Sequence, residues 1–548
     1  MTYPPEEASA SDAHPPGRRK PAKFPRNVLA IAAVVLAVMW LTPLLDHDER
    51  NFITPPVLGL VLILLGGWFA FFARVTPARR RAVLLAAMGF LGLLTLCFRL
   101  EGYTGDMHPK IVLRWSPKPY ELLDRPQEES ATTDTPPVAD LVNTTDVDYP
   151  QFLGPERRAT VHGIRLARDW KANPPKRLWR QPIGAGWSAF AVVGDYAVTQ
   201  EQRGDSELAV CYQVRTGKVV WSHATPGRFT SVMGGDGPRA TPTIADGNVY
   251  LQTATGLLLC LDGSNGALLW SHDLHKEHGS ENLNWGRSGS PLVVDRLVIV
   301  SAGGKENQSL VACDMETGQQ VWAAGTDISS YSSPAVATLA GVRQVLIVNQ
   351  DWAVGHRLAD GKVLWRHPWP GNSSSNASAS QAVPVGGRRV FLSKGYHVGC
   401  ELLELSPGNN ETLSVESLWK RSTLLKTKLT NVVLHDGHLF GLSQGVLECV
   451  DLATGKRRWK RGRYGHRQIV LVDALIVVLS ETGDVALVEA SSKKYRQIAR
   501  MEAIDGKTWN NPTLAGRYLL VRNAEEASCF ELPLVASPDQ TPADSQAE

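Results

Sequence analysis

Cysteine is scarce in this 548-residue sequence: it occurs seven times, and no two copies are adjacent or spaced as CxxC. That pattern excludes a disulfide framework and a cysteine-based zinc site. Four of the seven share one recurring position, two residues before an Asp or its equivalent: Cys211, Cys260, Cys449 and Cys529. We interpret these four as small buried hydrophobic residues.

A strong charge imbalance is also missing. The net charge is +3, and the basic residues are scattered without forming a stripe, which argues against a nucleic-acid-binding protein. The common signatures of serine hydrolases, zinc proteases, P-loop proteins and dinucleotide-binding enzymes do not occur in a fitting context.

Long apolar runs are confined to the first hundred residues. Three of them, at 28–45, 52–73 and 82–98, contain no charged residue and are long enough to span a bilayer. Three successive runs do not fit a single signal peptide. We therefore predict three transmembrane helices within 28–98, preceded by a cytoplasmic tail at 1–27.

The charges that flank these runs predict an orientation. Basic residues precede the first run and separate the second from the third, whereas the first loop, 46–50, is mostly acidic. By the positive-inside rule the N-terminus is cytoplasmic, and everything after the third run lies outside. This predicts a multi-pass protein of the cytoplasmic membrane with its main domain on the periplasmic side. We expect residues 99–148 to form a largely disordered extracytoplasmic linker, and 533–548 a disordered tail.

Between these segments, one short phrase recurs about every 40 residues: an apolar run, a glycine, and a tryptophan four residues later. Its five copies are Gly217–Trp221, Gly266–Trp270, Gly318–Trp322, Gly361–Trp365 and Gly455–Trp459. An Asp often stands four residues before the glycine, which is typical of a hairpin turn. A unit this short cannot bury its own apolar face, so the copies must pack on one another.

Each unit holds about four short strands without helical periodicity. Degenerate copies at Trp179, Trp419, Tyr495 and a last unit ending near Leu532 bring the total to eight. The last unit lacks its closing strand, which the segment around Trp179 can supply. We therefore predict an all-β, eight-bladed β-propeller over 149–532.

The tryptophans of the phrase are interpreted as structural residues that pack between blades: Trp221, Trp270, Trp322, Trp365, Trp419 and Trp459.

A binding site is predicted at the mouth of the central channel. The units can be aligned on the position that Pro242 occupies in its unit. The residues three positions before it lead into the innermost strands, and their types vary more than those of purely structural residues should. Aromatic residues and Arg dominate binding hot spots. The candidates are Trp187, Arg239, Tyr331, His466 and Trp509. Asn511 is a further candidate from the second column, which is the set of residues one position before the Pro242-like position of each unit. The structural alternative is that these side chains simply plug and rim the channel.

The repeats Asp314–Gly318 and Asp451–Gly455, with the Trp that follows each, resemble pyrroloquinoline-quinone (PQQ)-type propeller repeats. That family includes quinoprotein alcohol dehydrogenases and non-enzymatic BamB-like propellers, and the latter are closer in character to this chain. The resemblance implies a quinoprotein-like propeller. BamB-like proteins are lipid-anchored in the outer membrane, whereas this chain has three apolar runs.

We expect a membrane-anchored, extracytoplasmic module that binds an envelope protein or peptide, with no catalytic residues, metal or cofactor. The alternative is a membrane-bound, PQQ-dependent dehydrogenase. For such an enzyme the resemblance implies a vicinal cysteine pair and a calcium site of Glu, Asn and Asp, and neither is recognisable in the sequence.

Overall fold

The computed structural model describes residues 23–42, 44–117, 123, 138–304, 306–371, 373 and 376–535. Residues 1–22 of the tail expected at 1–27, residues 118–122 and 124–137 of the linker expected at 99–148, and the chain after 535 lie outside the described residues. The chain divides into two units, Met1–Phe98 and Arg99–Glu548.

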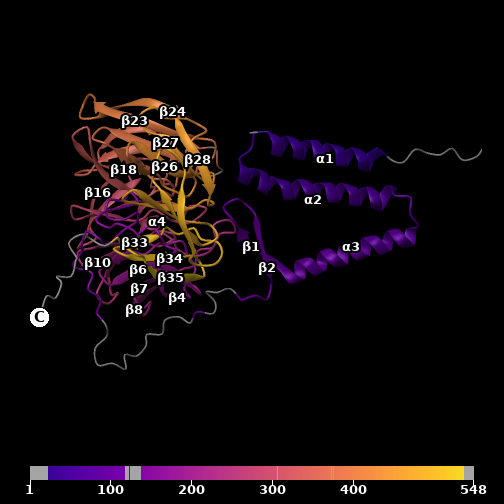
Figure 1. Ribbon diagram of the computed structural model, residues 1–548, viewed down its shortest axis with the longest axis horizontal. Coiled ribbons are helices and arrows are strands. Elements are labelled where there is room, and N and C mark those ends of the chain that lie inside the picture. The colour runs from indigo at the N-terminus through magenta and orange to yellow at the C-terminus, as the bar shows by residue number, and fades with distance from the viewer. Residues whose placement is uncertain are drawn as a thin grey trace, which may run out of the picture. The chain divides into compact units, whose positions relative to one another are not determined.

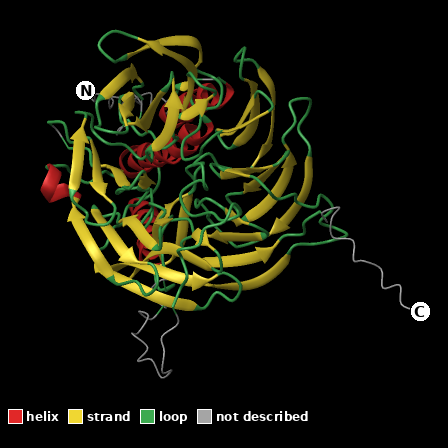
Figure 2. Ribbon diagram, turned by 90° about the vertical axis from the view of Figure 1, so that its left-hand side faces the viewer, coloured by secondary structure: helices red, strands yellow, loops and turns green. Residues whose placement is uncertain are grey.

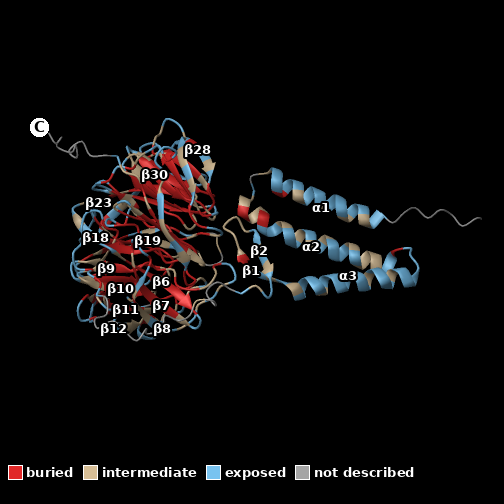
Figure 3. Cartoon of the chain, turned by 60° about the horizontal axis from the view of Figure 1, so that its bottom comes forward, coloured by how far each residue is buried: buried red, intermediate tan, exposed pale blue. Residues whose placement is uncertain are grey.

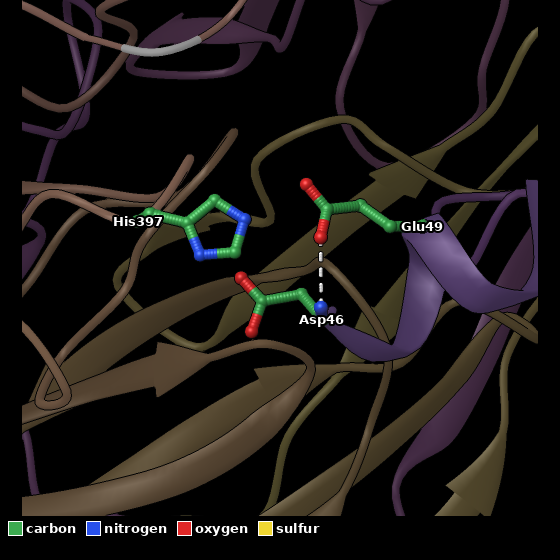
Figure 4. Close-up of side chains that lie close together, drawn as sticks. All are labelled: Asp46, Glu49 and His397. Atoms are coloured by element: carbon green, nitrogen blue, oxygen red, sulfur yellow. Dashed lines mark hydrogen bonds between the residues drawn. The ribbon is translucent and has the colours of Figure 1, made fainter. Parts of the chain in front are cut away.

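The first unit consists of three helices in the described residues: α1 (Lys23–Leu41), α2 (His47–Phe72) and α3 (Pro77–Cys97) (Figure 1). Each is long and apolar enough to cross a membrane. They begin about five residues earlier than the apolar runs. Capping explains the start of two of them: at α2 the Glu49 carboxylate accepts the Asp46 N–H at 2.8 Å (Figure 4), and Thr76 caps α3 by accepting the Arg79 N–H.

The second unit is an eight-bladed propeller, as predicted: eight sheets of four or more strands follow one another around a ring in the described chain (Figure 2). Blade 1 holds β5 (Ala191–Val193), β6 (Tyr196–Arg203), β7 (Ser206–Gln213) and β8 (Val219–Pro226). Blade 2 holds β9 (Thr243–Ala245), β10 (Asn248–Gln252), β11 (Leu257–Asp262) and β12 (Leu268–Asp273), followed by the short helix α4 (Leu274–His278). Blade 3 holds β13 (Leu292–Val294), β14 (Leu297–Ser301), β15 (Leu310–Asp314) and β16 (Gln320–Ala324). Blade 4 holds β17 (Ala335–Leu339), β18 (Val342–Val348), β19 (Trp352–Arg357) and β20 (Val363–Pro368).

Blade 5 holds β21 (Val383–Val385), β22 (Arg389–Lys394), β23 (Gly399–Pro407) and β24 (Leu413–Arg421). Blade 6 holds β25 (Val433–His435), β26 (His438–Ser443), β27 (Val446–Asp451) and β28 (Arg457–Arg463). Blade 7 holds β29 (Gln468–Val472), β30 (Leu475–Leu479), β31 (Asp484–Glu489) and β32 (Gln497–Glu502), with β3 (Thr160–Val161) added beside β29. Blade 8 holds β33 (Thr513–Ala515), β34 (Tyr518–Arg522), β35 (Glu526–Glu531) and β4 (Lys176–Pro182).

The strand β4 closes the ring. It pairs antiparallel with β35, with Trp179 opposite Cys529, so the missing strand of the last unit comes from the segment around Trp179. The Trp179 indole donates to the Val214 carbonyl of blade 1 at 2.7 Å. The prediction of the closing strand is thereby confirmed.

The glycine and tryptophan of the phrase meet across the blade boundaries. A Cβ atom on Gly266 would lie 2.6 Å from the Trp221 ring of the preceding blade, and Gly361 and Gly455 stand in the same relation to Trp322 and Trp419. The Trp221 indole also donates to the Gly263 carbonyl at 2.8 Å. Equivalent inter-blade bonds come from Trp270, Trp322, Trp419 and Trp459. Trp365 differs, because its indole donates to Gln344 within its own blade at 2.6 Å.

The second column forms hydrogen bonds between blades around the channel. The Thr241 N–H donates to the Ser290 hydroxyl and the Ser290 N–H to the Ser333 hydroxyl, each at 2.9 Å. In blade 5 the Gln381 N–H donates to the Asn431 side-chain oxygen. Gln381 stands one residue before the position that the repeat predicts. The column therefore holds neighbouring blades together.

The core lies between and within the blades, whose inner strands are buried (Figure 3). The helices of the first unit are largely exposed. The six cysteines of the propeller are buried and free of disulfides. Burial raises the pKa of each thiol of the recurring position, Cys211, Cys260, Cys449 and Cys529. They are therefore unreactive packing residues.

The segment after α3 is a β-hairpin rather than the unstructured linker expected there. β1 (Phe98–Tyr103) and β2 (Pro109–Leu113) pair in a two-stranded sheet joined by a turn at 104–108. Long-range contacts order it: Lys110 forms ion pairs with Glu101 at 2.8 Å and with the propeller residue Glu525 at 2.9 Å.

Candidate functional site

An arc of aromatic side chains lies on the segments that lead into the innermost strands of blades 1, 3, 4 and 8. The Trp187 and Trp509 ring centroids are 5.1 Å apart, and so are those of Trp285 and Tyr331. Trp187 and Trp509 are 322 residues apart in sequence, and the closure of the ring brings them together.

The loop 227–239 links these two aromatic pairs. Cβ atoms on Gly235 and Gly234 would lie 3.3 Å from the Trp187 ring and 3.5 Å from Trp285. The Trp187 indole donates to the Gly234 carbonyl. Arg239 also holds this loop, because its guanidinium donates to the Gly235 carbonyl at 2.9 Å. Arg239 therefore stabilises the conformation of this loop.

A half-buried lysine, Lys507, lies against the first aromatic pair. The Lys507 ammonium lies 4.0 Å from the Trp509 centroid and 5.0 Å from that of Trp187. Contacts of this length are attractive, because the ring face is negative. Burial lowers the pKa of Lys507 to about 8, although the Glu481 carboxylate acts in the opposite direction.

Glu481 is the hub of the neighbouring polar cluster. Its carboxylate accepts the Trp509 indole N–H at 3.2 Å and the His466 backbone N–H at 3.3 Å. The fully buried Arg467 guanidinium lies 3.2 Å from the same carboxylate. Burial raises the pKa of Glu481, but Arg467 and the N–H donors outweigh this effect and hold its pKa below the ordinary value. The carboxylate is thus ionised at neutral pH.

The structure brings four of the six candidates into one contiguous cluster. Trp187 and Trp509 pair directly, His466 joins them through Glu481, and Arg239 joins them through the loop 227–239. Tyr331 lies farther along the arc beside Trp285.

Asn511, the sixth candidate, does not belong to this cluster of contacts within the part of the chain that the structure describes. Its neighbour Asn510 makes the bond between blades 8 and 1, donating to the Ser188 carbonyl at 2.7 Å.

Sequence reasoning missed Glu481, Lys507 and Arg467. Glu481 stands in the turn between β30 and β31, outside the positions aligned on Pro242. Arg467 directly follows His466, and Lys507 lies two residues before Trp509. A search of the turns on the same face of the propeller would have found Glu481.

Comparison with known proteins decides the family. The profile described as outer membrane protein assembly factor BamB matches residues 170–281 and 234–461, together more than half of the chain. The chain belongs to the BamB family. It is 25% identical over 330 residues to BamB of Yersinia pestis, covering 56% of this chain and 76% of that protein. It is 23% identical over 357 residues to BamB of Moranella endobia, covering 62% of this chain and 82% of that protein.

Solved structures include both branches of the fold. BamB from Moraxella catarrhalis matches with a TM-score of 0.46 and 15% identity, and the match covers 65% of this chain and 100% of that chain. The quinohemoprotein alcohol dehydrogenase ADHIIG from Pseudomonas putida HK5 has a TM-score of 0.52 and 12% identity, and covers 72% of this chain and 81% of its own. At this identity the likeness to the dehydrogenase shows the fold alone.

The mouth of this BamB-family propeller is a poor match to a calcium–quinone pair. Ca²⁺ takes roughly six to eight oxygen ligands. Here the Glu481 carboxylate already lies among the donors of Arg467, Trp509 and His466, and the Lys507 ammonium adds positive charge nearby. Anionic groups of a partner suit such a surface better than a metal cation does.

Proposed function

We propose that this protein is a scaffold of the cell envelope, anchored by α1–α3, which binds another envelope protein through the channel mouth of its propeller. The observation that carries the proposal is the aromatic and cationic cluster of Trp187, Trp509 and Lys507 at that mouth. Trp is among the residues that dominate protein-binding hot spots, and the Lys507 ammonium adds a charge that an anionic group of a partner can meet.

Family membership supports a role in binding. The relatives are named outer membrane protein assembly factors. This chain has three helices that can span a membrane. We therefore propose a related assembly or scaffolding role that starts from the cytoplasmic membrane.

The flanking charges support a periplasmic propeller. Arg18, Arg19, Lys20, Lys23 and Arg26 precede the first apolar run, and Arg74, Arg79, Arg80 and Arg81 lie between the second and the third. Three spans then leave the propeller on the side opposite to these charges.

Crosslinking in native membranes, followed by mass spectrometry, tests the binding role. We expect a Trp187→Ala/Trp509→Ala double variant to lose at least one partner that the wild type captures. Trp352→Ala is the matched control, because Trp352 stacks on Arg366 in blade 4, whereas the aromatic pair joins blades 1 and 8. The proposal fails if the double variant, still folded by circular dichroism, captures every wild-type partner in full yield.

A further inference from the structure

The β1–β2 hairpin binds to the channel mouth through its turn. The Gly105 N–H donates to the Glu481 carboxylate at 2.5 Å, and the Lys507 ammonium donates to the Tyr103 carbonyl at 3.0 Å. Both propeller residues belong to the cluster around Trp509. The hairpin thus uses the same groups that the proposed function assigns to a partner.

Charge and shape complement each other at this contact. Asp106 lies 3.6 Å from both the His466 imidazole and the Arg463 guanidinium. A Cβ atom on Gly105 would lie 2.9 Å from Glu481 and from the His466 ring, so the turn fits only with glycine at this position. The mouth therefore contacts three features of the turn: the glycine N–H, the carbonyl two residues before it and the acidic side chain after it.

The propeller side of the contact carries an excess of positive charge. The Lys507 ammonium and the Arg467 guanidinium lie near the Glu481 carboxylate, and the Arg463 guanidinium faces Asp106 of the turn. Arg239 is balanced separately by Glu207 and Asp236. When the hairpin leaves, Asp106 leaves with it and the excess grows. An acidic segment is the occupant that this surface favours.

We propose that the channel mouth is a receptor for tight, glycine-containing acidic turns, and that the turn 103–106 of this chain is its resident ligand, which a partner's turn displaces. The proposal rests on the proposed function, because it names the partner chemistry of the same site. The membrane-proximal hairpin then keeps the desolvated cluster covered until a protein partner with such a turn arrives.

Two measurements on the full-length protein in lipid nanodiscs test this proposal. The first is hydrogen exchange of the amides in 101–110. The second is the affinity of a cyclised peptide with the sequence of residues 99–114. Gly105→Ala releases the resident turn, and Gly387→Ala is the matched control, because a Cβ there meets nothing within 4 Å.

We expect Gly105→Ala to speed exchange in 101–110 at least tenfold and to tighten peptide binding at least tenfold, while Gly387→Ala matches the wild type. Lys507→Met should also free the hairpin but lose the peptide. A peptide with Asn in place of its Asp should bind at least tenfold more weakly. Unprotected turn amides in the wild type, or equal peptide affinity for the wild type and Gly105→Ala, would overturn the proposal.

These measurements need no envelope partner. The intramolecular contact can therefore be verified even if crosslinking finds no partner, and partner capture can succeed even if the hairpin amides are unprotected.

Discussion

The glycines of the repeated phrase are fixed by the indole rings against which they lie. Gly266 has φ of +77° and would place a Cβ 2.6 Å from Trp221. Either condition disfavours a side chain, and together they account for the glycine in the phrase. The tryptophan supplies the other half of the contact, with its N–H bonded across the blade boundary.

Gly266→Ala should lower the free energy of unfolding of the propeller by at least about 2 kcal/mol, because it adds both backbone strain and a clash with Trp221. Gly163→Ala isolates the strain, since Gly163 has the same φ of +77° with nothing within 4 Å. That control should cost only about 1 kcal/mol. Chemical denaturation of the two variants measures the difference, and equal costs would rule out the glycine–indole contact.

Lys507 makes stability depend on pH. Its folded-state pKa is about 8 against an ordinary value of 10.5, so between these values the unfolded chain binds a proton that the folded chain does not. The free energy of unfolding should therefore rise with pH over this window, by at most about 3–4 kcal/mol. Lys507→Met should remove that part of the rise, and Lys456→Met, at an exposed position, should keep it. Identical slopes for Lys507→Met and the wild type would contradict this assignment.

Among the elements, the closing strand β4 joins the two ends of the propeller. Trp179→Ala removes its indole bond to Val214 and its packing on Gly217. Hydrogen exchange in β4 and β35 should speed up at least tenfold, because an open ring frays at its junction. Trp365→Ala is the control, since its indole bonds within blade 4 and its loss should leave β4 protected. Unchanged protection of β4 in Trp179→Ala would show that closure does not depend on this contact.

The element scale also separates what could be predicted from what could not. The eight blades and the closing strand follow from the spacing of glycine and tryptophan, because each unit carries its own turn chemistry. The β1–β2 hairpin does not follow, because Gly105 and Lys110 are held by Glu481 and Glu525, more than 370 residues away. No local pattern in 99–113 records those partners.

The same limit applies to the candidate site. Trp187 and Trp509 were predicted because a repeat supplies a register that aligns blades 1 and 8. Glu481 lies in a turn outside that register, and the register itself drifts by one residue at Gln381 and Asn510, where hydrogen bonds rather than apolar spacing fix the chain. The periodic spacing of apolar residues thus predicts the propeller. The polar cluster around Glu481 is found only once the three-dimensional structure is known.

For the whole molecule, the central claim is that the channel mouth, and not the outer rim of the blades, meets the partner protein. Val232 and Val321 allow a direct test, because they are the same residue type and are 65% and 54% exposed. Val232 lies in the mouth loop 227–239, and Val321 lies on β16, an outermost strand.

The decisive measurement is photocrosslinking in living cells, with a photoreactive amino acid placed at 232 or at 321. We predict a discrete adduct of higher mass from position 232 and none from 321. Adducts from 321 with none from 232 would contradict the account.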